Sequence, residues 1–94
     1  MRTIKTDGRY KLYSSGFHYI VEFKWHGLAD QQMFSKLVDG LTDTYGSAKY
    51  FDKEKNAYVL NSEWRYEIKK SAKRRRIYLK DESALSLVLL KVGA

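Results

Sequence analysis

The clearest pattern in the chain is an alternation of apolar and polar residues between positions 17 and 26. Five apolar residues fall on one side of an extended chain there: Phe17, Tyr19, Val21, Phe23 and Trp25. A period of two predicts a β-strand with one face in the core. Residues 9–13 alternate in the same way, and Ser14-Ser15-Gly16 between the two segments has turn composition. We therefore expect residues 9–26 to form a β-hairpin, preceded by a loose arm or frayed edge strand over residues 1–8.

After Gly27 the apolar residues change to helical spacing. They recur at intervals of three and four: Phe34, Leu37, Val38, Leu41 and Tyr45. Asp30 is suited to cap the first turn and Gly46 to end the helix. The pattern predicts a helix over about residues 31–45 that packs across the preceding strand, with Gly40 marking a close approach to the sheet.

Two further hairpins follow. Residues 48–52 and 57–60 flank an exposed turn at 53–56, and residues 63–69 are expected to pair with 74–80. In the second hairpin one face is apolar (Trp64, Tyr66 and Ile68) and the other is charged (Arg65, Glu67 and Lys69). We expect the apolar face to point into the core.

The last segment allows two interpretations. Leu85, Leu87 and Leu89 fit a strand, whereas Leu85, Val88, Leu89 and Val92 fit a helix. Helix signals favour the second: Asp81 as cap, Glu82 in the first turn, and Lys91 and Gly93 at the end. The order is then β-β-α-β-β-β-β-α. It predicts one α+β domain over residues 1–94, an antiparallel sheet of hairpins with two helices packed on one face.

The net charge of +7 is concentrated in one place. Residues 69–80 hold no acidic residue and seven bases: Lys69, Lys70, Lys73, Arg74, Arg75, Arg76 and Lys80. The other eleven bases equal the eleven acids of the chain, so the whole excess arises from these twelve residues. Charge gathered on one hairpin predicts a local positive potential. We expect its arginines to be exposed or only partly covered.

Such a hairpin favours an anionic partner. Lysines and arginines bind nucleic acid backbones by displacing counterions, and the guanidinium fork also fits phosphate or carboxylate. Tyr78, with Tyr13 and Tyr58, is a candidate for stacking on bases beside these cations. An acidic groove on a protein would attract the same hairpin. The simplest alternative is a solvated tip whose charges discourage aggregation of an edge strand.

Other kinds of site find little support. The chain has no cysteine, which excludes disulfides and thiolate chemistry and favours the cytoplasm or the interior of a virion. His18 and His26 would stand roughly 26 Å apart on one strand at about 3.3 Å per residue, too far to share a metal. Asp39 and Asp43 share a predicted solvent face and are interpreted as surface charge. With no nucleotide-binding motif, signal peptide or membrane-spanning run, we expect a non-catalytic protein without metal or cofactor.

The segment from Arg76 to Gly93 resembles known proteins weakly. A strand that ends in Asp81-Glu82 and leads into an apolar helix ended by glycine resembles the ending of many short tailed-phage proteins. It also resembles the third-strand-to-second-helix step of RNA recognition motifs and other ferredoxin-like domains. The similarity covers about 18 of 94 residues, and residues 74–80 lack the glycine and paired aromatics of the RNA-binding family. We expect no closing strand after the last helix, and carry over no base-stacking residue.

The leading hypothesis is therefore a small basic binding protein, encoded by a phage, that engages an anionic surface through residues 69–80. The phage-like resemblance implies an accessory factor associated with DNA or RNA, or an inhibitor of a host enzyme. The alternatives are a viral protein that binds a host protein or defence complex, and a small virion component that assembles through its edge strands.

Overall fold

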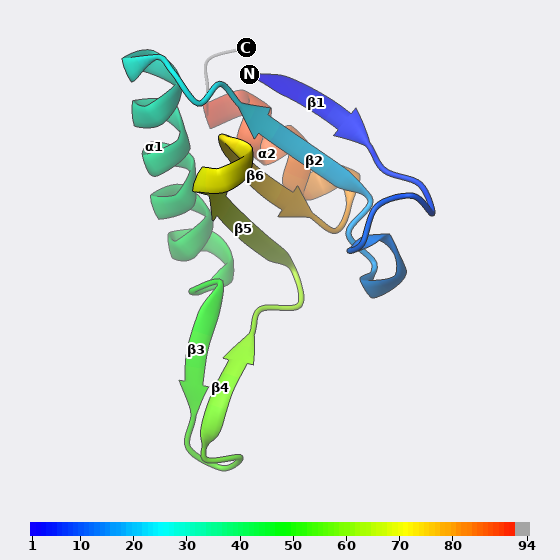
Figure 1. The fold of residues 1–94 in the computed structure, drawn as a ribbon. Helices are drawn as coiled ribbons and strands as arrows, with labels where there is room; N and C mark the ends of the chain where they lie inside the picture. Colours follow the sequence, from blue (N-terminus) through cyan, green and yellow to red (C-terminus); the bar gives the residue numbers. More distant parts are fainter. Residues whose placement is uncertain (92–94) are drawn as a thin grey trace.

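Two antiparallel sheets and two α-helices make up residues 1–91, the part of the chain that the computed structural model describes (Figure 1). The elements in chain order are β1 (Arg2–Lys5), β2 (Tyr19–Phe23), α1 (Leu28–Tyr45), β3 (Lys49–Asp52), β4 (Ala57–Leu60), β5 (Trp64–Lys69), β6 (Arg74–Leu79) and α2 (Glu82–Lys91). Short 3-10 helices occupy Tyr13–Ser15 and Lys70–Ala72. The predicted α+β class and the order of strands and helices are confirmed.

The main sheet has the strand order β1-β2-β6-β5, with every neighbouring pair antiparallel. The strands β2 and β5 run parallel on either side of β6, and the chain between them forms α1 and then the hairpin of β3 and β4. This is the split βαβ arrangement of ferredoxin-like domains. The edge beside β2, where a closing strand would lie in such a domain, is occupied by β1 from the start of the chain.

The partner of β2 differs from the sequence prediction. Arg2–Lys5 pairs with β2, whereas residues 9–13, expected to form the partner strand, contain turns that lead into the first 3-10 helix. Buried Thr6 extends the pairing, because its amide donates to the carbonyl of His18 at 2.8 Å and its hydroxyl to that of Phe17 at 2.9 Å. Of the two alternatives for residues 1–8, a loose arm or an edge strand, the structure shows the edge strand, formed by Arg2–Lys5.

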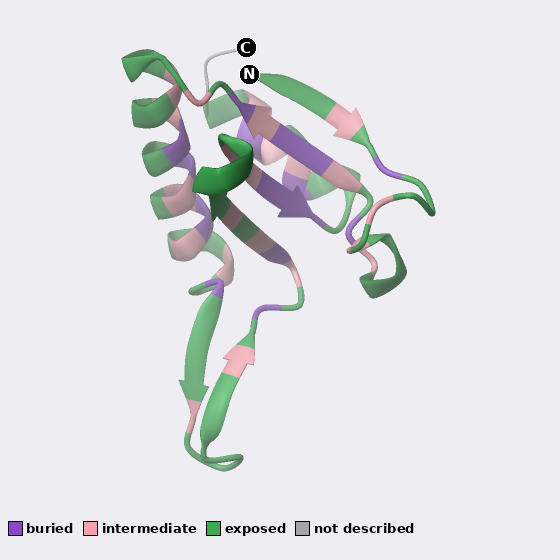
Figure 2. Ribbon diagram, viewed as in Figure 1, coloured by how far each residue is buried: buried purple, intermediate pink, exposed green. Residues whose placement is uncertain are grey.

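Both helices cover the same face of the main sheet. Phe34, Leu37 and Leu41 of α1 and Ala84 and Val88 of α2 belong to one buried cluster. The sheet contributes the other large members of this cluster: Val21, Phe23, Trp64, Ile77 and Leu79. The helical spacing in residues 34–45 therefore predicted the buried side of α1 correctly, as the inner stripe of that helix in Figure 2 shows.

A second, smaller cluster lies on the opposite face of the sheet, which we call the open face. It consists of Phe17, Ile20 and Tyr78, with Ile4 packed against it from β1. Phe17 precedes β2 and packs with Ile20, so its predicted place beside Val21 is wrong. The segment after β1 covers this cluster with Tyr10 and Leu12.

The strands β3 and β4 pair only with each other and project away from the main sheet (Figure 1). The hairpin itself was predicted, whereas its separation from the main sheet was not. On β5, Trp64 is fully buried but Tyr66 and Ile68 are about half exposed, so the predicted inward face is only partly covered. β5 is the strand at the edge of the main sheet.

The ends of α1 differ in how well they were predicted. The helix begins at Leu28, after Gly27 with a φ of 130°, and Asp30 does not cap it. Its carboxylate instead accepts the backbone amide of Lys24 at 2.7 Å, which holds the end of β2 against the first turn. At the other end Gly46 has a φ of 87° and its amide donates to the Thr42 carbonyl, as expected of a terminating glycine.

The close approach at Gly40 involves the second helix and not the sheet. A Cβ built on Gly40 would lie 3.0 Å from the Lys91 side chain of α2. The helical alternative for residues 82–91 is confirmed, and the Asp81 carboxylate caps it by accepting the Ala84 amide at 2.9 Å. The expected roles of Val92 and Gly93 lie outside the described residues.

Candidate nucleic-acid interface

The hairpin of β5 and β6 forms in the predicted register, with Lys69 opposite Arg74. Its turn is the 3-10 helix Lys70–Ala72, followed by Lys73 with a left-handed φ of 49°. We call Lys69, Lys70 and Lys73 the tip lysines, and all three are exposed. These positions match the expectation of a protruding basic turn.

The alternation of β6 separates the three consecutive arginines. Arg74 and Arg76 lie on the open face, whereas Arg75 points to the helix side. There its guanidinium carbon lies 4.2 Å from the centre of the Trp25 ring and it donates to the Trp25 carbonyl at 3.0 Å. Arg75 therefore holds the segment after β2, and its cationic group is engaged within the fold.

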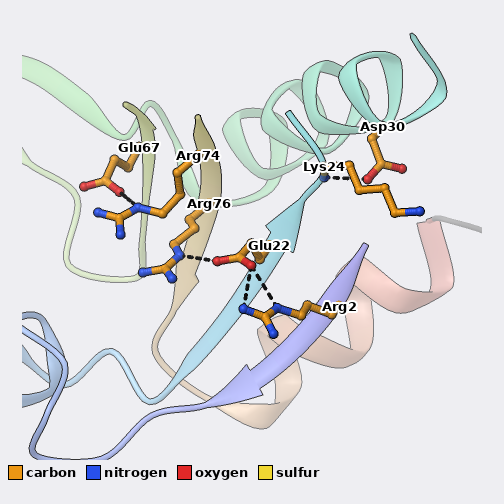
Figure 3. Close-up of polar contacts among 7 residues, drawn as sticks. All are labelled: Arg2, Glu22, Lys24, Asp30, Glu67, Arg74 and Arg76. Atoms are coloured by element: carbon orange, nitrogen blue, oxygen red, sulfur yellow. Dashed lines mark hydrogen bonds and ion pairs between the residues drawn. The ribbon is translucent and has the colours of Figure 1, made fainter. Parts of the chain in front are cut away.

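The open-face arginines are paired with carboxylates. Arg76 donates to Glu22 at 2.7 Å, and Arg2 donates to the other oxygen of Glu22 at 2.8 Å. Arg74 donates to Glu67 at 2.8 Å (Figure 3). Positive and negative side chains thus alternate across four strands, in the row Arg2, Glu22, Arg76 and Glu67. The sequence interpretation treated residues 69–80 as wholly uncompensated, and this pairing corrects it.

Glu22 is held ionised by its two arginines. Burial raises the pKa of Glu22, but hydrogen bonds from Arg76 and Arg2 outweigh that effect and leave it below its usual value. Burial correspondingly lowers the pKa of Arg76, and the bond to Glu22 reverses that effect and raises it. The three side chains fasten β6 to β2 and β1.

Replacement of Glu22 by glutamine should destabilise the protein by about 1–2 kcal/mol at pH 7, because Arg76 loses a charged hydrogen-bond partner at a partly buried site. A carboxyl whose folded pKa is depressed contributes stability above its unfolded pKa and loses it as the pH falls through the folded value. The difference between wild type and Glu22→Gln in urea denaturation should therefore shrink below about pH 4.3. Asp43→Asn, on the exposed face of α1, is the control. A difference that persists unchanged at pH 3 would contradict the ionised triad.

Two hollows on the surface flank Arg74 and Arg76. The larger, of about 540 Å³, lies between the segment 9–12 and the strands β5 and β6. Its lining residues are Arg9, Tyr10, Lys11, Leu12, Glu67, Lys69, Arg74, Arg76 and Tyr78. The smaller, of about 360 Å³, extends along the end of β2 to the tip and includes Lys24 and Lys73. Together they make a basic depression beside the tip lysines.

Three of the expected site residues lie apart from this depression or beneath its surface: Arg75 on the helix side of the sheet, Lys80 and Tyr78. Lys80 is exposed at the opposite end of β6, roughly 20 Å along the strand from Arg74 at about 3.3 Å per residue. Tyr78 lines the larger hollow, but its side chain belongs to the open-face cluster and is only 7% exposed. Burial raises the pKa of Tyr78, so its hydroxyl keeps its proton at neutral pH.

Sequence reasoning missed the cations that the N-terminal half contributes. Arg9, Lys11 and Lys24 line the two hollows although they are distant from the hairpin in sequence. The alternation in residues 9–13 predicted a strand, in which Arg9 and Lys11 occupy polar positions. No signal in the local pattern shows that this segment folds back over β5 and β6.

The described residues show no cluster of three or more histidine and carboxylate side chains suited to a metal ion. Of the two helices within residues 1–91, neither is long and apolar enough to cross a bilayer. Comparison of the chain with protein-family models, curated proteins and solved structures gives no significant match. Fold and site together define a small α+β protein with a basic depression on the open face of its sheet.

Proposed function

We propose that this protein is a non-catalytic binding module that engages the phosphate backbone of a nucleic acid through the tip lysines and the adjoining depression. The observation that carries the proposal is the convergence of cations from separate segments. The tip, β6 and residues 9–11 all contribute basic side chains to neighbouring hollows, where Glu22 and Glu67 are the acidic lining residues.

We expect the affinity to depend strongly on electrostatic contacts and little on the base sequence of the nucleic acid. Phosphate contacts position a protein on nucleic acid without reading the bases. Arg9, Arg74 and Arg76 are already paired with carboxylates, so the three exposed tip lysines and Lys11 should supply most of the counterion displacement. The interaction should therefore involve about three or four phosphates and depend on salt accordingly.

The test is the fluorescence anisotropy of a labelled oligonucleotide titrated with protein between 50 and 200 mM salt. For a single strand we expect the logarithm of the association constant to fall linearly with the logarithm of salt concentration, with a slope of about −2 to −3. Single strands of unrelated sequence should bind with affinities within about threefold of one another, and so should duplexes of unrelated sequence. Duplexes and single strands are compared separately because their charge densities differ. Absence of measurable binding at 50 mM salt would reject the proposal.

A protein partner is the second candidate, favoured by the hairpin of β3 and β4. Phe51 and Tyr58 face each other across it at 5.4 Å between ring centres; Phe51 is about half exposed and Tyr58 is 69% exposed. Exposed aromatic side chains are enriched at the energetic centres of protein interfaces. A partner such as a host enzyme or defence complex should then survive nuclease treatment in a pull-down and be lost with Phe51→Ser/Tyr58→Ser. Loss of the partner on nuclease digestion would leave the nucleic acid proposal in place.

A further inference from the structure

The larger hollow contains one carboxylate among many cations. Of its nine lining residues, Glu67 is the only acidic one, and five are basic: Arg9, Lys11, Lys69, Arg74 and Arg76. Arg9 is paired with Asp7 at 2.9 Å, Arg74 with Glu67 and Arg76 with Glu22, whereas Lys11 and Lys69 make no ion pair with the residues that the structure describes. Its volume of about 540 Å³ lies within the range of pockets that bind small ligands or one unit of a larger one, about 300–1,000 Å³. The lining therefore has the size and charge for an anionic group.

Glu67 makes the contacts that such a group would make. Its Oε1 accepts a hydrogen bond from Arg74 Nε at 2.8 Å and one from the Tyr78 hydroxyl at 3.4 Å (Figure 3 shows the Arg74 contact). An anionic oxygen that faces a guanidinium and a neutral hydroxyl is the environment in which phosphate oxygens are held in proteins. A carboxylate and a phosphate group present the same kind of acceptor to these donors.

The Arg74–Glu67 ion pair is also accessible enough to solvent for another anion to replace Glu67. The side chains of Arg74 and Glu67 are 28% and 35% exposed, in contrast to the Arg76–Glu22 pair at 14% and 20%. Ion pairs at this exposure contribute little stability, so a better anion can replace one partner at small cost. Glu22 fastens three strands together, whereas Glu67 holds only its own hairpin.

We propose that the larger hollow binds a phosphate group and that Glu67 takes the place of this group when no ligand is present. This inference rests on the proposed function and specifies its site. An incoming phosphate displaces Glu67 from Arg74, so binding requires an anion that competes with a neighbouring carboxylate. Singly charged anions such as chloride or acetate are poor competitors, and a dense array of phosphates is a good one.

The experiment compares Glu67→Gln with wild type in the binding of a labelled oligonucleotide and of inorganic pyrophosphate at 50 mM salt. Glutamine keeps the shape of the side chain but removes the competing charge, so we expect binding about fivefold tighter. Glu54→Gln is the matched control, because it changes the net charge equally at the exposed turn between β3 and β4. The control should change the affinity less than twofold.

The outcomes are distinct from those that test the proposed function. If wild type binds no oligonucleotide, the proposed function itself is wrong. If wild type binds and Glu67→Gln is no tighter than wild type or than Glu54→Gln, the place-holder role of Glu67 is wrong and the proposed function stands. Tightening for pyrophosphate as well as oligonucleotide supports a site for any phosphate compound, and tightening for the oligonucleotide alone supports a site that needs the polymer. Glu67→Ala repeats the comparison if the glutamine variant folds poorly.

Discussion

Trp64→Ala is expected to destabilise the protein by about 3–5 kcal/mol. Trp64 is fully buried, stacks on Tyr66 with ring centres 5.9 Å apart, and donates its indole N–H to the Gly46 carbonyl at 2.9 Å. It therefore joins the start of β5 to the end of α1. Truncation would leave a large cavity in a core of few residues. It would also leave the Gly46 carbonyl with only the longer hydrogen bond from the Asn61 side-chain amide at 3.4 Å.

The measurement is urea denaturation followed by circular dichroism. Because small domains are stable by only about 5–15 kcal/mol, a loss of this size should leave Trp64→Ala barely folded or unfolded at 25 °C. Leu90→Ala, at a side chain that is 72% exposed on α2, is the control and should cost less than about 1 kcal/mol. A cost for Trp64→Ala below that of the control would contradict the position of this residue at the centre of the core.

The second large effect concerns binding. Lys70→Glu/Lys73→Glu should weaken oligonucleotide binding at least tenfold at 50 mM salt, because two attractive charges become two repulsive ones at the exposed tip. The slope of the salt dependence should become shallower by about 1–2. Both side chains are exposed, so the variant should remain folded. Anisotropy and thermal unfolding measured on the same preparation check both expectations.

The matched control is Lys53→Glu/Lys55→Glu at the exposed turn between β3 and β4, which changes the net charge by the same amount. It should keep most of the affinity, since that turn lies on the hairpin that projects from the main sheet (Figure 1). Equal losses in the two variants would mean that total charge, and not its position, governs binding. Reversal of Arg76 is a poorer test, because a carboxylate there would face Glu22 and disturb the sheet.

Local pattern was enough to predict most elements of this fold. The period of two in residues 63–69 and 74–80 and the helical period in residues 34–45 each correspond to an observed element. The prediction that residues 9–26 form a hairpin was wrong, and the reason is physical. Arg2–Lys5 is only four residues long and has a weak alternation, whereas residues 9–13 alternate well but turn. Alternation shows that a segment can be extended, but not which other segment it pairs with.

The position of the β5–β6 hairpin was predicted, whereas the pairing of its arginines with carboxylates was not. The register of the β5–β6 hairpin, which was expected from sequence, already places Glu67 opposite Arg76. The pairing of Arg76 with Glu22 depends on β2 lying beside β6, a contact between residues 54 positions apart. Such non-local contacts follow from the tertiary fold, and no periodicity in the chain encodes them.

The most direct test is to map the binding surface by backbone amide chemical shifts during titration with an oligonucleotide. Shifts should be largest in residues 9–12 and 67–76, which border the larger hollow and the tip, and should saturate together. Shifts confined to residues 49–60 or to the exposed face of α1 would contradict a phosphate-binding surface on the open face.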